Sequence, residues 1–195
     1  MDYVKLIEAI VRIVMRNNPA HGYEHVMRVR KLALQIASRV PNADKEVVEL
    51  AALLHDIGRN LYTPENHATR SAMIARELLT ALGYPKEKLQ RVVNAIEAHS
   101  YSGGAEPNCI EGEILSDADK LDALGAVGLA RVFMYSGQTG RGLKDSIAHI
   151  KSKLLKLPNL MKTEEGKKLA QERVKLVKEF LKHLETELNS LNLAN

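Results

Sequence analysis

Hydrophobic residues recur along this chain with the spacing of an α-helix. In the stretch YVKLIEAIVRIVMR, residues 3–16, they fall three or four positions apart and line one face of a helix. Asp2, immediately before this stretch, is a suitable N-cap. The same periodicity, bounded by Pro, Gly and Asn, predicts helices over residues 23–39, 44–56, 66–82, 86–99, 111–135, 144–156 and 164–191.

No segment shows the strict alternation of a β-strand, and no internal repeat is visible. The glycine clusters at 103–104 and 137–142 lie between predicted helices rather than after strands, so they are poor candidates for phosphate-binding loops. We therefore predict an all-α fold, a helical bundle forming one domain over residues 1–195. Its core is expected over about 20–135, with a C-terminal helical extension over about 143–191.

Composition narrows this picture without changing it. Aromatic residues make up only 4% of the 195 positions and Trp is absent, so the core must be aliphatic. The single cysteine, Cys109, excludes an intrachain disulfide and fits a reducing, cytoplasmic location. Charged residues among the first 16 positions argue against a signal peptide, and no apolar run approaches the ~18 residues that a membrane span needs.

The charge of the chain is modest and unevenly distributed. There are 28 Lys and Arg against 24 Asp and Glu, a net charge of +4, and the excess lies in residues 141–195. A solvated basic face on the terminal helices explains it, and attraction of a phosphorylated substrate is the alternative. The excess is too scattered to indicate nucleic acid as a partner, although a nucleic-acid-binding module is kept as a minor hypothesis.

Four polar residues project from apolar faces toward a common interior: His25, His55, Asp56 and Asp117. A buried carboxylate is costly unless it is paired or bound to metal, and these faces carry no Lys or Arg. Imidazole and carboxylate together suit Fe, Mn, Co, Ni or Zn better than Ca. Taken singly, each residue could instead be a satisfied core histidine or a helix cap. Together they predict a divalent transition-metal site with open positions for water and substrate.

Three motifs of the chain resemble those of a known family. H-x-x-x-H-V-x-R-V at 21–29, L-A-A-L-L-H-D-I-G at 50–58 and D-A-D-K-L-D-A-L-G-A-V-G-L-A-R at 117–131 resemble the HD superfamily of metal-dependent phosphohydrolases. The late stretch EGEILSDADKLDALGAVGLARVF and the tail are similar to a bacterial and archaeal subgroup of small HD hydrolases. Some of its members are pyrophosphohydrolases of nucleoside or deoxynucleoside triphosphates. The resemblance covers nearly the whole chain.

The resemblance implies roles for particular residues. It makes His25, His55, Asp56 and Asp117 the ligands of one metal ion. His21 matches the position of a general acid that protonates the leaving oxygen, and its alternative is a hydrogen bond to a loop.

For several further residues, two different roles are possible. His67 and His99 match the order of two histidines that hold a second metal in dinuclear HD proteins, and their alternative is an outer hydrogen bond or a phosphate contact. Lys120 and Arg28 are candidates for phosphate contact or for structural ion pairs. Arg59 stands where some nucleotide-cleaving HD enzymes have a glutamate, which puts the transfer of that mechanism in doubt.

We therefore expect a metal-dependent phosphohydrolase that cleaves a phosphoester or phosphoanhydride, with a nucleotide as the substrate implied by the resemblance. The chain has no recognisable base-binding motif, and stacking would have to use Tyr23, Tyr62, Tyr101 or Tyr135. The alternatives are a dinuclear HD protein with oxidative chemistry and a non-enzymatic regulator. The sequence leaves open whether the chain forms a homo-oligomer.

Overall fold

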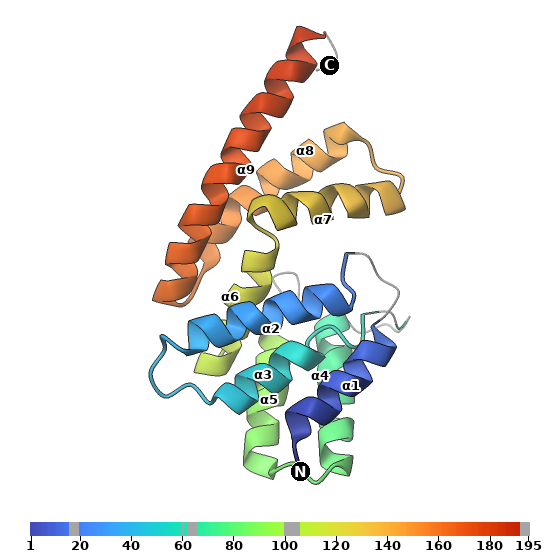
Figure 1. Ribbon diagram of the computed structural model, residues 1–195, viewed down its shortest axis with the longest axis vertical. Coiled ribbons are helices and arrows are strands. Elements are labelled where there is room, and N and C mark those ends of the chain that lie inside the picture. Colours follow the sequence, from blue (N-terminus) through green and yellow to red (C-terminus); the bar gives the residue numbers. More distant parts are fainter. Residues whose placement is uncertain (16–19, 60, 62–65, 100–105, 192–195) are drawn as a thin grey trace.

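The computed structural model describes residues 1–15, 20–59, 61, 66–99 and 106–191, and all regular elements within them are helical (Figure 1). This confirms the predicted all-α class. Tyr62 and Tyr101, considered above for base stacking, lie outside the described residues. The elements are α1 (Tyr3–Val14), α2 (Tyr23–Ala37), α3 (Lys45–Leu54), α4 (His67–Ala81), α5 (Lys86–Ala98), α6 (Ile110–Asp122), α7 (Gly125–Gln138), α8 (Leu143–Ser152), a 3₁₀ segment (Leu154–Leu160) and α9 (Glu164–Ser190).

Helix starts follow the capping chemistry of the sequence. The Asp2 carboxylate accepts a hydrogen bond from the Lys5 amide, as expected of an N-cap. Asp44 does the same for α3 and Asn66 for α4. These caps fix where the helices begin and therefore which side chains stand at their ends.

Helices α1 to α6 pack around an aliphatic core, and α7 to α9 form a second group above it (Figure 1). α2 packs against α3 and α6, and α4 and α5 form an antiparallel pair joined by a short turn. Leu50, Leu53, Leu54, Ile96 and Ile114 are fully buried, in keeping with the expected aliphatic interior. α6 runs between the two groups and contacts α2, α3 and α5 on one side and α9 on the other.

The prediction of one continuous helix over 111–135 is wrong. α6 ends at Asp122, Leu124 is extended, and α7 begins at Gly125, whose φ of +71° favours glycine. Apolar periodicity continues across so short a break, so the pattern could not reveal it. The prediction for 144–156 also ran too far, because α8 ends at Ser152 and a 3₁₀ segment containing Pro158 follows.

The C-terminal helix is fixed to α6 by polar contacts. The Arg173 guanidinium donates to the carbonyl of Leu121 at 2.6 Å, and its aliphatic part lies 3.5 Å from the point where a Cβ on Gly125 would stand. Within the described segments, every helix is too short or too polar to span a lipid bilayer.

Candidate metal centre

The first turn of α2 and the end of α3 bring His25, His55 and Asp56 together. The Nε2 atoms of the two histidines are 3.2 Å apart, and the Asp56 Oδ2 lies 3.6 Å from His25 Nε2 and 3.8 Å from His55 Nε2. All three side chains are buried, with at most 1% exposed. Two imidazole nitrogens and a carboxylate oxygen converging in a buried space form a donor set that suits a divalent transition metal.

The turn after α3 gives these residues their position. α3 ends at Leu54, so His55 and Asp56 lie in the turn that follows rather than on the helix itself. The Gly58 amide donates to Ser71 Oγ at 3.0 Å, and a Cβ on Gly58 would stand 2.8 Å from the backbone nitrogen of Ser71. Only glycine fits here, so the turn is held against α4 and cannot move away from the centre.

A second group shares Asp56. The Asp56 Oδ1 lies 3.7 Å from His67 Nε2 at the start of α4 and 4.0 Å from His99 Nε2 at the end of α5. Among the described residues, Asp56 Oδ1 and His99 Nε2 are the buried side-chain polar atoms without a hydrogen-bond partner. Such atoms are costly to bury, and a cation between them would remove the cost. The histidines predicted as a second group are thus next to the first group.

The backbone and Asp122 set the tautomers of three histidines. His55 Nδ1 lies 2.8 Å from the carbonyl of Ala52, and His99 Nδ1 lies 2.5 Å from that of Ile96. Because a carbonyl only accepts, each Nδ1 carries a proton, and in the neutral ring each Nε2 then keeps its lone pair for a metal. His25 donates in the same way from Nδ1 to Asp122 Oδ2 at 2.7 Å. All three Nε2 atoms point into the centre ready to coordinate.

The structure does not bring Asp117 to this centre, which corrects the expectation from the sequence. Its Oδ1 accepts from the Lys162 amide at 2.8 Å, and its Oδ2 accepts from the amide and hydroxyl of Thr163 at 2.8 and 2.7 Å. Asp117 therefore fixes the N-terminus of α9. The prediction failed because α6 is buried on two sides, so an apolar face did not identify the side that carries the histidines.

Asp119 lies where Asp117 was expected. Its Oδ1 is 3.5 Å from His25 Nε2, and 29% of its side chain is exposed. Burial raises the pKa of Asp119, but His25 and His55 lower it more, so the net pKa lies well below the usual range. Two residues along a helix correspond to nearly opposite faces, which is why Asp117 and Asp119 point to different partners.

Asp122 is a site residue that sequence reasoning missed. It accepts from His25, from Arg28 at 2.7 and 3.1 Å and from Arg131 at 2.8 Å. Burial raises the pKa of Asp122, but the hydrogen bonds from His25 and Arg28 bring it down to about 2. Its spacing of three from Asp119, which puts both on one helical face, is the signal that could have found it.

The remaining predicted residues surround the centre. Arg28 is committed to Asp122, the ion pair that was its alternative role. Lys120 is buried and donates to the Ser116 carbonyl at 3.2 Å and to its hydroxyl, and burial lowers the pKa of its ammonium group. Arg59 donates to Asp56 Oδ2 at 2.7 Å, so it neutralises the carboxylate that the two groups share.

His21 stands just before α2, half-buried, with its ring edge-to-face against His25 at 5.7 Å between centroids. Burial and the charge of Arg59 lower the pKa of His21 to about 3. The imidazole is therefore neutral at pH 7 and can donate a hydrogen bond through its N–H.

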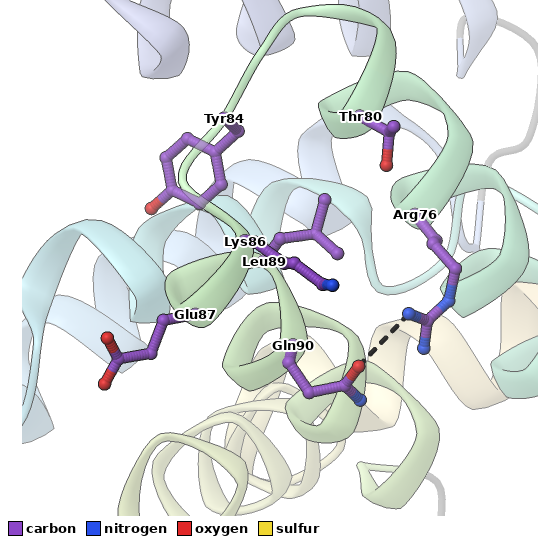
Figure 2. A pocket seen from close by; sticks show the side chains of 7 residues that line it. All are labelled: Arg76, Thr80, Tyr84, Lys86, Glu87, Leu89 and Gln90. Carbon is purple, nitrogen blue, oxygen red and sulfur yellow. Dashed lines mark hydrogen bonds between the residues drawn. The ribbon is translucent and has the colours of Figure 1, made fainter.

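A cavity of about 540 Å³ lies at the other end of the α4–α5 pair (Figure 2). Arg76 and Thr80 of α4 face Lys86, Leu89 and Gln90 of α5 across it, and Arg76 donates to the Gln90 side chain at 3.1 Å. His67 and His99 occupy the opposite ends of the same two helices. This cavity is therefore separate from the metal centre.

Comparisons with known proteins identify the family to which the chain belongs. Residues 22–124 match the model of the HD domain. The chain is 35% identical over 188 residues to the uncharacterized protein YpgQ of Bacillus subtilis, covering 92% of this chain and 90% of YpgQ. The crystal structure of YpgQ in complex with ADP superposes with a TM-score of 0.79 at 34% identity, covering 95% of this chain and 97% of YpgQ.

Two further solved structures are similar. One is a predicted HD superfamily hydrolase from an uncultured Thermotogales bacterium, with a TM-score of 0.72 at 34% identity, covering 95% of this chain and 92% of that one. The other is an HD-superfamily hydrolase from Bacillus thuringiensis, with a TM-score of 0.75 at 29% identity, covering 96% and 97%.

Proposed function

The chain belongs to the HD-domain family, and from this premise we propose that it hydrolyses nucleotides at a metal centre held by His25, His55, Asp56 and Asp119. Family membership makes it a metal-dependent phosphohydrolase. The observation that carries the assignment of the centre is the buried convergence of His25, His55 and Asp56, with Asp119 Oδ1 3.5 Å from His25 Nε2. The nucleotide is supported by YpgQ, which was crystallised with ADP.

The bound ion and the protein divide the chemistry between them. A divalent ion such as Fe, Mn, Co, Ni or Zn supplies positive charge to phosphoryl oxygens and makes water a stronger acid. The protein keeps the donors fixed: Asp122 orients His25, and Arg59 holds Asp56. The Ala52 carbonyl accepts from His55 Nδ1 and so fixes the tautomer that leaves Nε2 facing the other donors. Because the donors are positioned before substrate arrives, little reorganisation is needed during the reaction.

We place His21 beside the leaving oxygen of the substrate. It lies next to His25 at the entry to α2, outside the buried donors. As a neutral imidazole it donates an N–H hydrogen bond to the developing charge on that oxygen. Lys120 is proposed as a positive group near the phosphates, whereas Arg28 acts through Asp122 by holding it against His25.

A second ion is proposed between Asp56, His67 and His99. Asp56, His67 and His99 would hold it, because Asp56 belongs to both donor groups and its Oδ1 lies 3.7 Å from His67 Nε2 and 4.0 Å from His99 Nε2. The measurement is metal content at saturating Mn²⁺. Two ions per chain are expected in the natural protein and one in His99→Ala. A single ion per chain in the natural protein would contradict the second site.

The chain as a whole is inferred to act as one unit. Its core over about 20–135 carries the centre, and the helices over about 143–191 support α6 through Asp117 and Arg173.

The nucleotide assignment is tested with purified protein loaded in turn with Mn²⁺, Fe²⁺, Co²⁺, Ni²⁺ and Zn²⁺. Nucleoside mono-, di- and triphosphates are offered, and release of phosphate and pyrophosphate is followed. The expected result is release by the natural protein with at least one ion, reduced by about 100-fold or more in Asp119→Ala. Equal release by both proteins, or none from any nucleotide, overturns the proposal.

A further inference from the structure

Helix α7 reaches His21, the residue that borders the buried donors of the metal centre. Arg131 holds it there, because its Nε donates to the Ala20 carbonyl at 2.9 Å and its Nη1 donates to Asp122 at 2.8 Å. One helical turn later, Tyr135 stands on the same face. Its ring meets His21 edge-to-face, with the centroids 6.2 Å apart. The helix thus carries an aromatic ring to the residue that borders the buried donors.

Tyr135 is exposed although it lies against the site. Its exposed fraction is 41%, whereas the neighbouring donor residues His25, His55 and Asp56 are nearly inaccessible. A tyrosine that served packing alone would turn its ring into the apolar interior. Here the ring lies against His21 and still has part of its surface exposed to solvent, where a ligand could contact it.

Arg141 adds a cation to the same spot. The chain turns back after α7 through Gly140, whose φ is +68°, and the Arg141 amide donates to the Ser136 carbonyl at 2.9 Å. This places the Arg141 guanidinium carbon 5.4 Å from the centre of the Tyr135 ring. The pair presents an aromatic ring and a planar cation side by side.

The pair matches the chemistry of a nucleobase. Aromatic rings and guanidinium planes are the protein groups on which bases stack, and the guanidinium also attracts the phosphates attached to them. The His21 ring lies between His25 and Tyr135, so a substrate whose reacting phosphate lies at His25 and that extends past His21 would meet the Tyr135 ring. Among the tyrosines considered for stacking, Tyr23 is instead hydrogen-bonded to Glu8.

We propose that Tyr135 and Arg141 form the subsite that binds the base of the nucleotide and so select nucleotides over bare phosphate chains. This inference rests on the proposed nucleotide hydrolysis, since it assigns the outer part of the same site. It makes Tyr135 a specificity-determining residue, with the chemistry left to the buried donors.

The test compares ATP with inorganic tripolyphosphate, which has the phosphate chain but no base or sugar. The Mn²⁺-loaded natural protein, Tyr135→Ala, Tyr135→Phe and Arg141→Ala are assayed for KM and kcat with ATP, for Kd with ADP by calorimetry, and for the inhibition constant of tripolyphosphate. Met134→Ala is the control, because Met134 is 44% exposed on the same helix and has no place in the site.

The expected result for Tyr135→Ala is a rise of about tenfold in KM for ATP and Kd for ADP, with kcat and the tripolyphosphate constant within twofold of the natural protein. Tyr135→Phe should retain ATP binding, and Arg141→Ala should weaken it. Unchanged binding of ATP and ADP in Tyr135→Ala, or an equal change for tripolyphosphate, overturns the subsite. A natural protein that cleaves no nucleotide overturns the proposed function instead, so the two failures are distinct.

Discussion

Asp117 and Asp119 are carboxylates of α6 that lie two residues apart. They face opposite sides of this helix. Asp117 is fully buried and accepts three hydrogen bonds from Lys162 and Thr163 at the start of α9. Asp119 is partly exposed and faces the Nε2 of His25. One side of the helix therefore holds the C-terminal extension, and the other side faces the proposed metal centre.

The difference shows that burial alone does not identify a metal ligand. Both carboxylates come from a helix with apolar neighbours, and the more deeply buried one is the structural one. What separates them is the set of partners: Asp117 is satisfied by N–H and O–H donors, whereas Asp119 Oδ1 faces His25 Nε2 across 3.5 Å. Substituting the structural carboxylate should therefore change stability, and substituting the one at the proposed centre should change metal binding.

The largest effect is expected for Asp119→Ala. Loss of a direct ligand should lower bound metal at limiting ion concentration and reduce phosphohydrolase activity by about 100-fold or more. The unfolding free energy of the metal-free protein should fall by less than in Asp117→Ala, because Asp119 is partly exposed although His25 and His55 stabilise its ionised form. Metal analysis, kinetics and urea unfolding measure the three quantities. Full activity in this variant would remove Asp119 from the centre.

Asp117→Ala should show the opposite pattern. It leaves buried N–H donors at the start of α9 without an acceptor, so the unfolding free energy should fall by about 3 kcal/mol. Metal bound per folded chain should stay within twofold of the natural value. Urea unfolding and metal analysis of the folded fraction distinguish the outcomes. Loss of metal without loss of stability would restore Asp117 as a ligand.

Gly166→Ala tests the same contact from the side of α9. A Cβ at this position would stand 2.2 Å from Asp117 Oδ2 and 2.8 Å from the Thr163 hydroxyl. The carboxylate must then shift, and the expected loss is about 2 to 3 kcal/mol of unfolding free energy. Gly137→Ala is the matched control, since no atom lies within 4 Å of its Cβ position. An unchanged Gly166→Ala would show that α9 is not tightly held.

Asp122 provides the smallest test, through pH. Its folded-state pKa of about 2 is below the ordinary value of 3.8, so its ionised form stabilises the fold. This contribution is complete above about pH 4 and is lost as the pH falls through the folded pKa, at up to about 2 kcal/mol. Urea unfolding between pH 5 and 2 should therefore show a shallower decline in Asp122→Asn than in the natural protein. Identical slopes would contradict the pairing with His25 and Arg28.

The sequence was sufficient to predict the part of the site that depends on local order. His25 follows a glycine cap, and His55 and Asp56 follow an apolar helix that must end in the core, so their meeting followed from the pattern. Asp119 and Asp122 were not found, because α6 has two buried sides and helical periodicity cannot say which neighbour each side meets. That information lies in the packing of α2 and α9 against it, which is long-range.

The same reasoning explains the missed helix boundary. A glycine inside an apolar run is compatible with a helix, and only the contact with Arg173 and the positive φ of Gly125 reveal the break. The cap Asp2, by contrast, acts on its own first turn and was predicted from the chain.

The break at Gly125 divides the proposed site into two parts. The match to the HD domain ends at residue 124, so every proposed metal ligand precedes the break and the Tyr135–Arg141 pair follows it. Arg131 of α7 donates to Asp122 and so helps to orient His25, whereas Tyr135 and Arg141 form the proposed base subsite. The break thus separates the residues proposed to bind the metal from those proposed to bind the base, and one arginine connects the two sides.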